Sequence, residues 1–312
     1  MAYEALAADY LALDRLSDAE AALERAKGHK LDSLLLRQNA YVLAFLNSDM
    51  PSIAQQVAWA AGRPGEEDML LSMQSDTEAY YGRLTKARQC SRRAVESATR
   101  ADSREAAALW QVNAALREAE FGNAAVAKRD VTKALALSRG RDVSEVSGLT
   151  LARIGDQEGA KRIILELEKN QPSNIFLHVY WLPLIKATAA LNRGNASQSL
   201  ALLESSAAYE LGTAGASINN LYPAYVRGQA YLQAYNGTQA IAEFQKLLDH
   251  RGIVENFPTG ALAHLQIGRG YVMSGEISKA KSAYEYFFAL WKDADPDIPI
   301  LNQATSEYAK LR

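Results

Sequence analysis

Two stretches near the C-terminal end of the chain repeat one pattern of small and aromatic positions. Each has a small residue, an aromatic residue three positions later, a second small residue nine further on, and an aromatic residue four after that. The two copies are Gly228, Tyr231, Ala240 and Phe244, and Gly268, Tyr271, Ala280 and Tyr284. The offset between them is 40 residues. Recurrence at a fixed offset predicts a repeat protein.

The pattern predicts a pair of antiparallel helices in each copy. A small residue and an aromatic residue three positions apart lie on one face of a helix. Asn236-Gly237 and Ser274-Gly275 supply turn residues between the two halves of each copy. Small side chains at both key positions allow the helices to approach closely, while the rings fill the groove beside them. One such hairpin cannot bury its apolar face alone, so the copies must stack.

The same skeleton extends over the rest of the chain with offsets of 33 to 41 residues. We expect one superhelical domain over residues 1–312, with the clearest units at 3–30, 221–251 and 261–292 and a last helix at 299–311. The other expected units cover residues 34–61, 69–98, 105–138, 142–172 and 175–208. Ala304, Tyr308 and Leu311 form the expected inner face of the last helix.

This skeleton resembles the tetratricopeptide repeat (TPR). In the eighth unit the match includes Ile267 and Gly268, Tyr271, Ala280 and Tyr284. The resemblance implies an all-α fold: a right-handed α-solenoid of about eight TPR-like helical hairpins with a C-terminal capping helix.

Longer stretches of the sequence resemble a more specific group of proteins. AQQVAWAAGRPGEED, LYPAYVRGQAYL, EFQKLLDHRGIV and LWKDADPDIPIL are similar to the C-terminal region of eukaryotic-like serine/threonine protein kinases of the acidobacterial type. The resemblance implies the non-catalytic sensor or docking half of a bacterial signal transduction kinase. Tyr3 already falls inside a first helix with no capping residue before it, which favours a chain cut from a longer protein whose upstream kinase domain is absent here.

Composition and charge exclude several classes of function. The net charge of −2 provides no basic field for nucleic acid. No apolar run reaches the roughly 18 residues that a membrane span requires, so this chain is not expected to insert into a membrane. We therefore expect a cytoplasmic location, or an extracytoplasmic one if the parent protein has a span upstream. Cys90 is the only cysteine and forms no intrachain disulfide.

Catalytic and metal-binding patterns are missing from the sequence. It has no glycine-rich phosphate loop, VAIK-like lysine, HRD or DFG motif, so the chain itself is not expected to be an enzyme. The four histidines are scattered without metal-ligand spacing. Asp293, Asp295 and Asp297 alternate as in a calcium loop, but the required Gly and Glu are absent. We expect no metal and no cofactor.

The concave face of the solenoid is the candidate binding surface. The resemblance implies that particular positions of each first helix line the inner groove. In this sequence those positions are Arg37, Tyr41, Phe45, Asp76, Tyr80, Arg153, Trp181, Thr188, Asn192, Tyr222, Tyr225, Gln229, Gln233, Arg269 and Met273. Rings, guanidinium groups and amides in this mixture suit a protein or peptide ligand. The alternative is that several rings, Trp181 and Tyr222 above all, pack between neighbouring hairpins.

Two other functions stay open. The array could self-associate into a homo-oligomer and bring its parent proteins together, because the first helix is uncapped and apolar residues lie near the last helix. It could also be a free-standing TPR adaptor. The Lys and Asn pairs of the carboxylate-clamp subclass are absent, so the sequence does not support recognition of a chaperone's acidic C-terminus.

Overall fold

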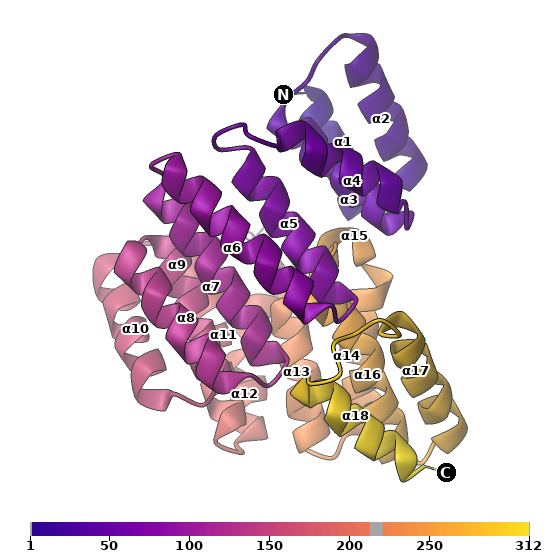
Figure 1. Cartoon of the computed structure of the whole chain (residues 1–312). Helices are drawn as coiled ribbons and strands as arrows, with labels where there is room; N and C mark the ends of the chain where they lie inside the picture. The colour runs from indigo at the N-terminus through magenta and orange to yellow at the C-terminus, as the bar shows by residue number, and fades with distance from the viewer. Residues whose placement is uncertain (1, 213–220, 312) are drawn as a thin grey trace.

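The computed structural model describes residues 2–212 and 221–311, and in these residues all regular structure is helical. Eight hairpins follow one another along the chain (Figure 1). Their first helices are α1 (Ala2–Ala12), α3 (Leu34–Leu46), α5 (Glu67–Tyr80), α7 (Arg104–Glu120), α9 (Arg141–Arg153), α11 (Leu182–Asn192), α13 (Tyr222–Gln233) and α16 (Pro258–Met273). Their second helices are α2 (Leu16–Gly28), α4 (Met50–Ala60), α6 (Leu84–Arg100), α8 (Ala124–Leu137), α10 (Gln157–Asn170), α12 (Ala196–Leu202), α14 (Gly237–Asp249) and α17 (Ile277–Leu290).

Four shorter or terminal elements complete the chain. These are a π-helical turn η1 (Leu177–Trp181), a 3₁₀ turn η2 (Glu204–Tyr209), α15 (Arg251–Val254) and α18 (Pro299–Ala309). The π-turn precedes Pro183, which has no N–H to donate along the helix. The carbonyl of Val179, four residues before that proline, accepts a 3.1 Å hydrogen bond from Ser205 Oγ of η2 instead. Residues 209–217 have the sequence YELGTAGAS, a Gly-rich connection, and residues 213–217 of it lie outside the described residues.

Glycine at the small positions allows the close contact between helices that the sequence pattern predicts. A Cβ placed on Gly228 would lie 2.6 Å from the Phe244 ring, and one on Gly268 would lie 2.9 Å from the Tyr284 ring. Real Cβ atoms do not approach rings so closely, and glycine therefore lets each pair of helices touch through its aromatic residue. The all-α solenoid of TPR-like hairpins is confirmed.

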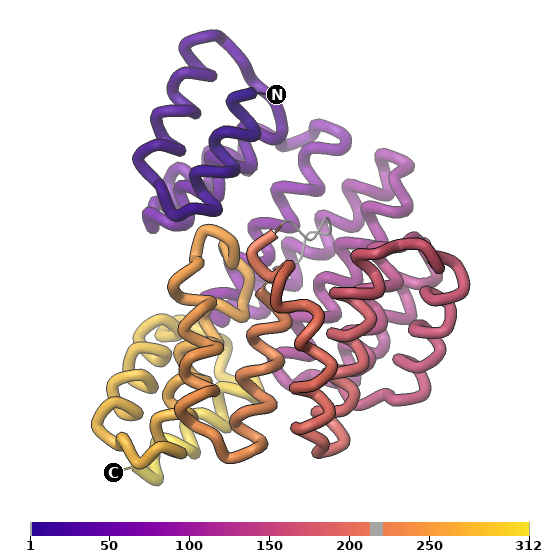
Figure 2. Tube along the Cα trace, turned by 180° about the vertical axis from the view of Figure 1, so that it is seen from behind, coloured from indigo at the N-terminus to yellow at the C-terminus, as the bar shows by residue number. Residues whose placement is uncertain are grey.

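The solenoid closes on itself, which the sequence did not predict. Helix α16 packs against α5, and α15 packs against α1 and α3. Asn256 Nδ2, between α15 and α16, donates to the Met73 carbonyl at 2.7 Å and to Thr77 Oγ1 at 2.9 Å. Seen from behind, the C-terminal hairpins lie against the earlier ones (Figure 2). The inner face of the third and fourth hairpins is therefore covered by the chain's own C-terminal third.

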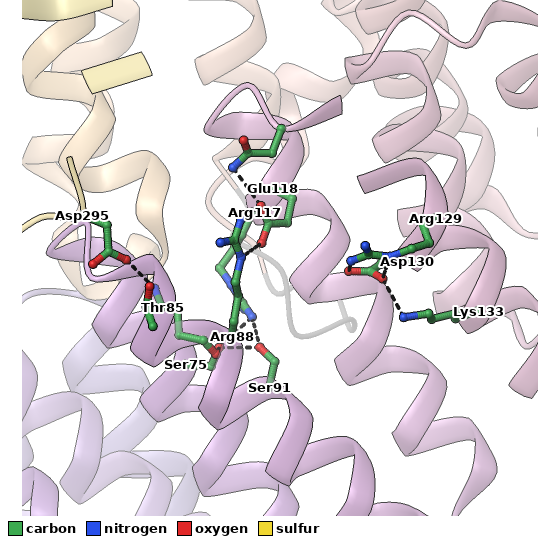
Figure 3. Close-up of polar contacts among 12 residues, drawn as sticks. Ser75, Thr85, Arg88, Ser91, Arg117, Glu118, Arg129, Asp130, Lys133 and Asp295 are labelled. Carbon is green, nitrogen blue, oxygen red and sulfur yellow. Dashed lines mark hydrogen bonds and ion pairs between the residues drawn. The ribbon is translucent and has the colours of Figure 1, made fainter. Parts of the chain in front are cut away.

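A C-terminal strap, residues 291–301, completes this closure. The backbone N–H of Asp295 donates to the Gly82 carbonyl at 3.0 Å, and that of Ile300 donates to the Phe121 carbonyl at 3.2 Å. The Asp295 carboxylate also accepts from the Thr85 N–H (Figure 3). The strap thus crosses the turns of the third and fourth hairpins. The apolar core is continuous from the third hairpin to α18, whereas the first two hairpins have smaller clusters of their own.

Candidate functional site

An open groove of about 410 Å³ lies where the first helices of hairpins five to eight end. Arg153, Asn192 and Gln233 are the last residues of α9, α11 and α13. The groove is lined by Arg153, Leu191, Asn192, Gln229, Leu232, Gln233, Gln266, Arg269, Gln303 and Glu307. Five of the residues predicted from sequence therefore converge here: Arg153, Asn192, Gln229, Gln233 and Arg269.

Arg153 is fixed at the inner wall of this groove. Its Nε lies 2.7 Å from Glu120 Oε1, its Nη2 donates to Glu120 Oε2 at 2.7 Å, and its Nη1 donates to Gln229 Oε1 at 2.6 Å. Burial acts to lower the pKa of Arg153, but the charge of Glu120 outweighs it and the net pKa lies above its ordinary value. Arg153 is a permanently charged anchor that is ion-paired with Glu120 and holds Gln229 in place.

The amides at the helix ends are held by backbone groups of the preceding hairpin. Asn192 Nδ2 donates to the Arg153 carbonyl at 2.9 Å and also to the Ala152 carbonyl. Gln233 Nε2 donates to the Leu191 carbonyl at 3.1 Å. Both side chains are exposed, and within the described chain no partner is seen for their amide oxygens. Preorganised acceptors of this kind can pair with the N–H groups of a bound protein segment at low entropic cost.

A second guanidinium, that of Arg269, lies at the far end of the groove. Arg269 Nη1 donates to Gln266 Oε1 at 3.2 Å, and the same guanidinium is paired with Glu307 of α18. The side chains of Arg269 and Glu307 are 19% and 27% exposed, so solvent reaches this pair. The pair between Arg153 and Glu120 is less accessible to solvent, because its side chains are 12% and 1% exposed.

Seven of the predicted surface residues are buried, which corrects the expectation that they line an accessible face. They are Tyr41, Phe45, Asp76, Trp181, Thr188, Tyr222 and Tyr225. Tyr41, Phe45 and Asp76 are buried against the next hairpin along the chain, through Thr77, Tyr80 and Arg117, whereas closure of the solenoid covers Tyr222. Tyr222 packs against Phe257 and donates its hydroxyl to Glu120, more than 100 residues earlier in the chain. Trp181 packs edge-on against Tyr180 at a centroid distance of 5.6 Å. For Trp181 and Tyr222 the packing interpretation therefore holds.

The remaining predicted residues lie away from the groove. Arg37 pairs with Asp32 at 2.7 Å and stacks over Trp59 at 4.9 Å, on the second hairpin. Tyr80 is partly buried against Phe45, with ring centroids 5.0 Å apart. Met273 is half-buried at the end of α16 and is not part of the groove lining.

Gln266, Gln303 and Glu307 are groove residues that the sequence analysis missed. Gln266 lies outside the positions that line the groove in an ideal repeat. Glu307 is three residues after Ala304 and adjacent to Tyr308, so the helical period alone places it on the inner face of the last helix. That signal was present in the sequence and could have identified it.

Three further surface cavities lie elsewhere on the described part of the chain, but none of them indicates a specific binding site. A groove of about 560 Å³ separates α2 from α3 and α4, and spaces of about 430 Å³ and 360 Å³ recur beside α10. All three lie beside the second helices of consecutive hairpins, as stacking of hairpins alone produces. No group of three metal-ligating side chains is found in residues 2–212 and 221–311. Within the same ranges, no helix combines the length and apolar character of a membrane span.

A scan against protein-family models and a search of curated proteins each find no match. Among solved structures, the chain is similar to a tetratricopeptide repeat protein from Parabacteroides merdae, with a TM-score of 0.47 and 15% identity, covering 89% of this chain and 98% of that chain. It is also similar to the TPR domain of P58(IPK), with a TM-score of 0.30 and 13% identity, covering 99% and 97%. At these TM-scores the likenesses carry no argument of their own. The fold assignment rests on the stacked helical hairpins described above.

Proposed function

We propose that the chain is a non-catalytic scaffold that binds a segment of a partner protein in the groove at the ends of α9, α11, α13 and α16. The observation that supports this most directly is the convergence of five predicted residues from four consecutive hairpins on one open groove. The amides of Asn192 and Gln233 are tethered through their N–H groups to backbone carbonyls, and polar groups fixed in this way can pair with polypeptide backbone.

Substitution of two groove amides tests this proposal. Gln233→Ala removes an exposed groove amide, and Gln229→Ala removes a half-buried one together with its bond to Arg153 Nη1. Tyr225 is fully buried, and its removal would damage the fold. Gln89→Ala, on the exposed face of α6, is the matched control. Capture from lysate of the source cells should yield a protein that the wild type and the Gln89 variant retain and that both groove variants lose. Equal capture by all four proteins would exclude the groove.

We further propose that this scaffold is the sensor or docking half of a bacterial serine/threonine protein kinase. The support is the set of long phrases in the sequence, including LWKDADPDIPIL, which forms the strap. An antibody raised to this chain tests the proposal by immunoblot of source cells. A band well above 34.1 kDa that shows kinase activity after immunoprecipitation is expected. A band at 34.1 kDa would instead mean a free-standing adaptor.

Self-association is a second candidate function, and the first hairpins favour it. Leu13, Leu31 and Leu35 are 66%, 48% and 55% exposed there. Exposed apolar side chains in one region can mark a protein contact. Sedimentation over a hundredfold concentration range decides the question. A mass that rises with concentration, and that Leu35→Ser returns to that of a monomer, would support self-association, and a constant monomeric mass would exclude it.

A further inference from the structure

Helix α18 places a carboxylate on Arg269, the partly exposed cation of the groove. Glu307 accepts two hydrogen bonds from Arg269, from Nε at 2.9 Å and from Nη2 at 3.0 Å. It accepts a third from the Tyr284 hydroxyl at 2.8 Å. Two parallel bonds between a guanidinium fork and a carboxylate form a specific recognition geometry. Arg269 and Tyr284 therefore form a carboxylate site, and α18 fills it.

The rest of α18 is mostly exposed and packs only partly against the solenoid. Ala304 is the only residue of the helix that is fully buried. Ile300, Tyr308 and Leu311 lie on the same face and are partly exposed. Tyr308 packs edge-on against Phe288, with ring centroids 5.6 Å apart, and donates its hydroxyl to Glu285 at 2.6 Å. The helix lies at the surface beside α16 and α17, close to the C-terminal end of the described chain (Figure 1).

A short amphipathic helix of this kind has little stability of its own. Besides the buried Ala304, its attachment depends on partly exposed apolar side chains that pack against the core, on the hydrogen bonds and ring contacts of Tyr308, and on the partly exposed ion pair of Glu307. Because solvent reaches this ion pair, water and competing ions can replace either partner. The inner anchor, Arg153, has no such freedom, since its carboxylate partner Glu120 is buried within the core of the solenoid.

We propose that α18 is an exchangeable helix that occupies a docking site in cis, and that a partner helix of similar chemistry takes its place. The partner helix would present a small residue, a glutamate three positions later and an aromatic residue next to it, as Ala304, Glu307 and Tyr308 do. This inference rests on the proposed function of the groove and names the partner class for its α16 end. Such binding follows the helix-in-groove mode of recognition.

The tether of α18 sets how strongly it competes with a partner. A tethered segment acts at an effective concentration on the millimolar scale, so the cis helix suppresses binding in trans. Apparent affinity for the partner falls in proportion to the fraction of molecules whose site is open. Weakening α18 without touching the site should therefore strengthen binding in trans.

A fluorescent peptide of residues 299–311 tests the proposal on the full chain. Its fluorescence anisotropy is measured with the wild type, with Glu307→Gln, and with Arg269→Gln/Glu307→Gln. We expect Glu307→Gln to bind the peptide at least about tenfold more tightly than the wild type, because a charge-assisted bond to the cis helix is lost while the site is intact. The double variant should lose this gain. A peptide with glutamine in place of the glutamate is the matched control and should show no gain.

Hydrogen exchange gives an independent readout. The amides of α18 should exchange faster in Glu307→Gln than in the wild type, while those of α16 and α17 stay unchanged. The inference is overturned if Glu307→Gln gives no gain in peptide affinity, or if the gain persists without Arg269. It is also overturned if α18 is protected equally in both proteins. Loss of captured partner in the Gln229 and Gln233 variants would be unaffected by any of these results, so the two proposals fail separately.

Discussion

The indole N–H of Trp291 donates a 2.9 Å hydrogen bond to the carbonyl of Tyr80, across 211 positions of sequence. The Trp291 ring also packs edge-on against Phe121, with centroids 5.2 Å apart. Beneath it, Gly82 leaves no space for a side chain, since a Cβ there would lie 2.8 Å from the indole. One side chain therefore joins the turns of the third and fourth hairpins to the end of the eighth, and the solenoid is held closed.

Trp291→Ala should destabilise the closed form. Removing a buried tryptophan costs about 3–5 kcal/mol, and the change also leaves the Tyr80 carbonyl without its partner. Urea unfolding should report this loss, and small-angle scattering should show a larger radius of gyration. Trp59→Ala is the control, because Trp59 is half-buried on the second hairpin and takes no part in closure. Equal losses for both variants, with no change in radius, would contradict the role given to Trp291.

Gly268→Leu tests the packing of the eighth hairpin. The new side chain would meet the Tyr284 ring, which is buried and cannot move aside. Overpacking of this kind costs about 1–3 kcal/mol. Gly28→Leu is the control, since nothing lies within 4 Å of a Cβ at that position. Thermal unfolding should shift for the first variant and stay near wild type for the second. Identical transitions would mean that the helices are packed differently.

Two arginines labelled in Figure 3, Arg117 and Arg129, should respond differently to substitution. Arg117 is buried, pairs with Asp76 and donates to the hydroxyls of Ser75 and Ser91. Arg117→Met would leave a buried carboxylate without its cation, at a cost of about 3–5 kcal/mol. Asp76→Asn in the same chain should recover part of the loss, because no charge then remains buried.

Arg129→Met is the control for this comparison. Arg129 is exposed and pairs with the neighbouring Asp130. Because Arg129 itself is exposed and Lys133 still pairs with Asp130, its loss should cost about 0–1 kcal/mol. Denaturant unfolding of the two arginine variants should therefore give clearly different free energies of unfolding. Similar values would show that the Arg117 network is not sealed from water.

Stability should fall as pH rises through the neutral range. Burial raises the pKa of Glu145 from 4.5 to about 8, with Asp142 adding to the effect and Arg141 opposing it. Between these values the folded chain keeps a proton that the unfolded chain releases, so this contribution is complete below pH 4.5 and is lost as pH approaches 8. Burial also raises the pKa of Glu255, to about 7, which acts in the same direction.

Glu145→Gln isolates the contribution of Glu145. Its free energy of unfolding, relative to wild type, should increase by up to about 1.4 kcal/mol per pH unit from pH 6.5 to 8. This window avoids His264, whose pKa burial lowers from 6.5 to about 4. Glu96→Gln, on the exposed face of α6, is the control, and its free energy of unfolding should change with pH in parallel with that of wild type. A Glu145→Gln curve that also runs parallel would mean that the carboxyl is ionised in the folded chain.

The helical hairpins could be predicted because their determinants are local. The spacing from Gly228 to Phe244 lies within one hairpin, and the turn glycines lie between its helices. Closure of the solenoid depends instead on small rotations that accumulate from hairpin to hairpin, and no short window of sequence encodes their sum. The contact of Trp291 with Tyr80 therefore had no local signal.

The candidate site was predicted in part for the same reason. Positions at the ends of the first helices, such as Asn192 and Gln233, stay exposed whether the array is open or closed. Tyr222 and Tyr225, nearer the start of α13, are covered by rings of the seventh and eighth hairpins, and Tyr222 also reaches Glu120 at the end of α7. A pattern derived from an open array assigns both sets to a surface, and only the tertiary fold separates them.

The central claim is that the groove at the ends of α9, α11, α13 and α16 binds a partner segment. A photo-crosslinking amino acid at Gln233 tests it most directly, with the same group at Thr132, on the exposed face of α8, as control. We predict one crosslinked partner from position 233, lost on addition of Gln229→Ala and absent from position 132. Equal crosslinking from both positions, or none from position 233 while other parts of the chain capture a partner, would contradict the claim.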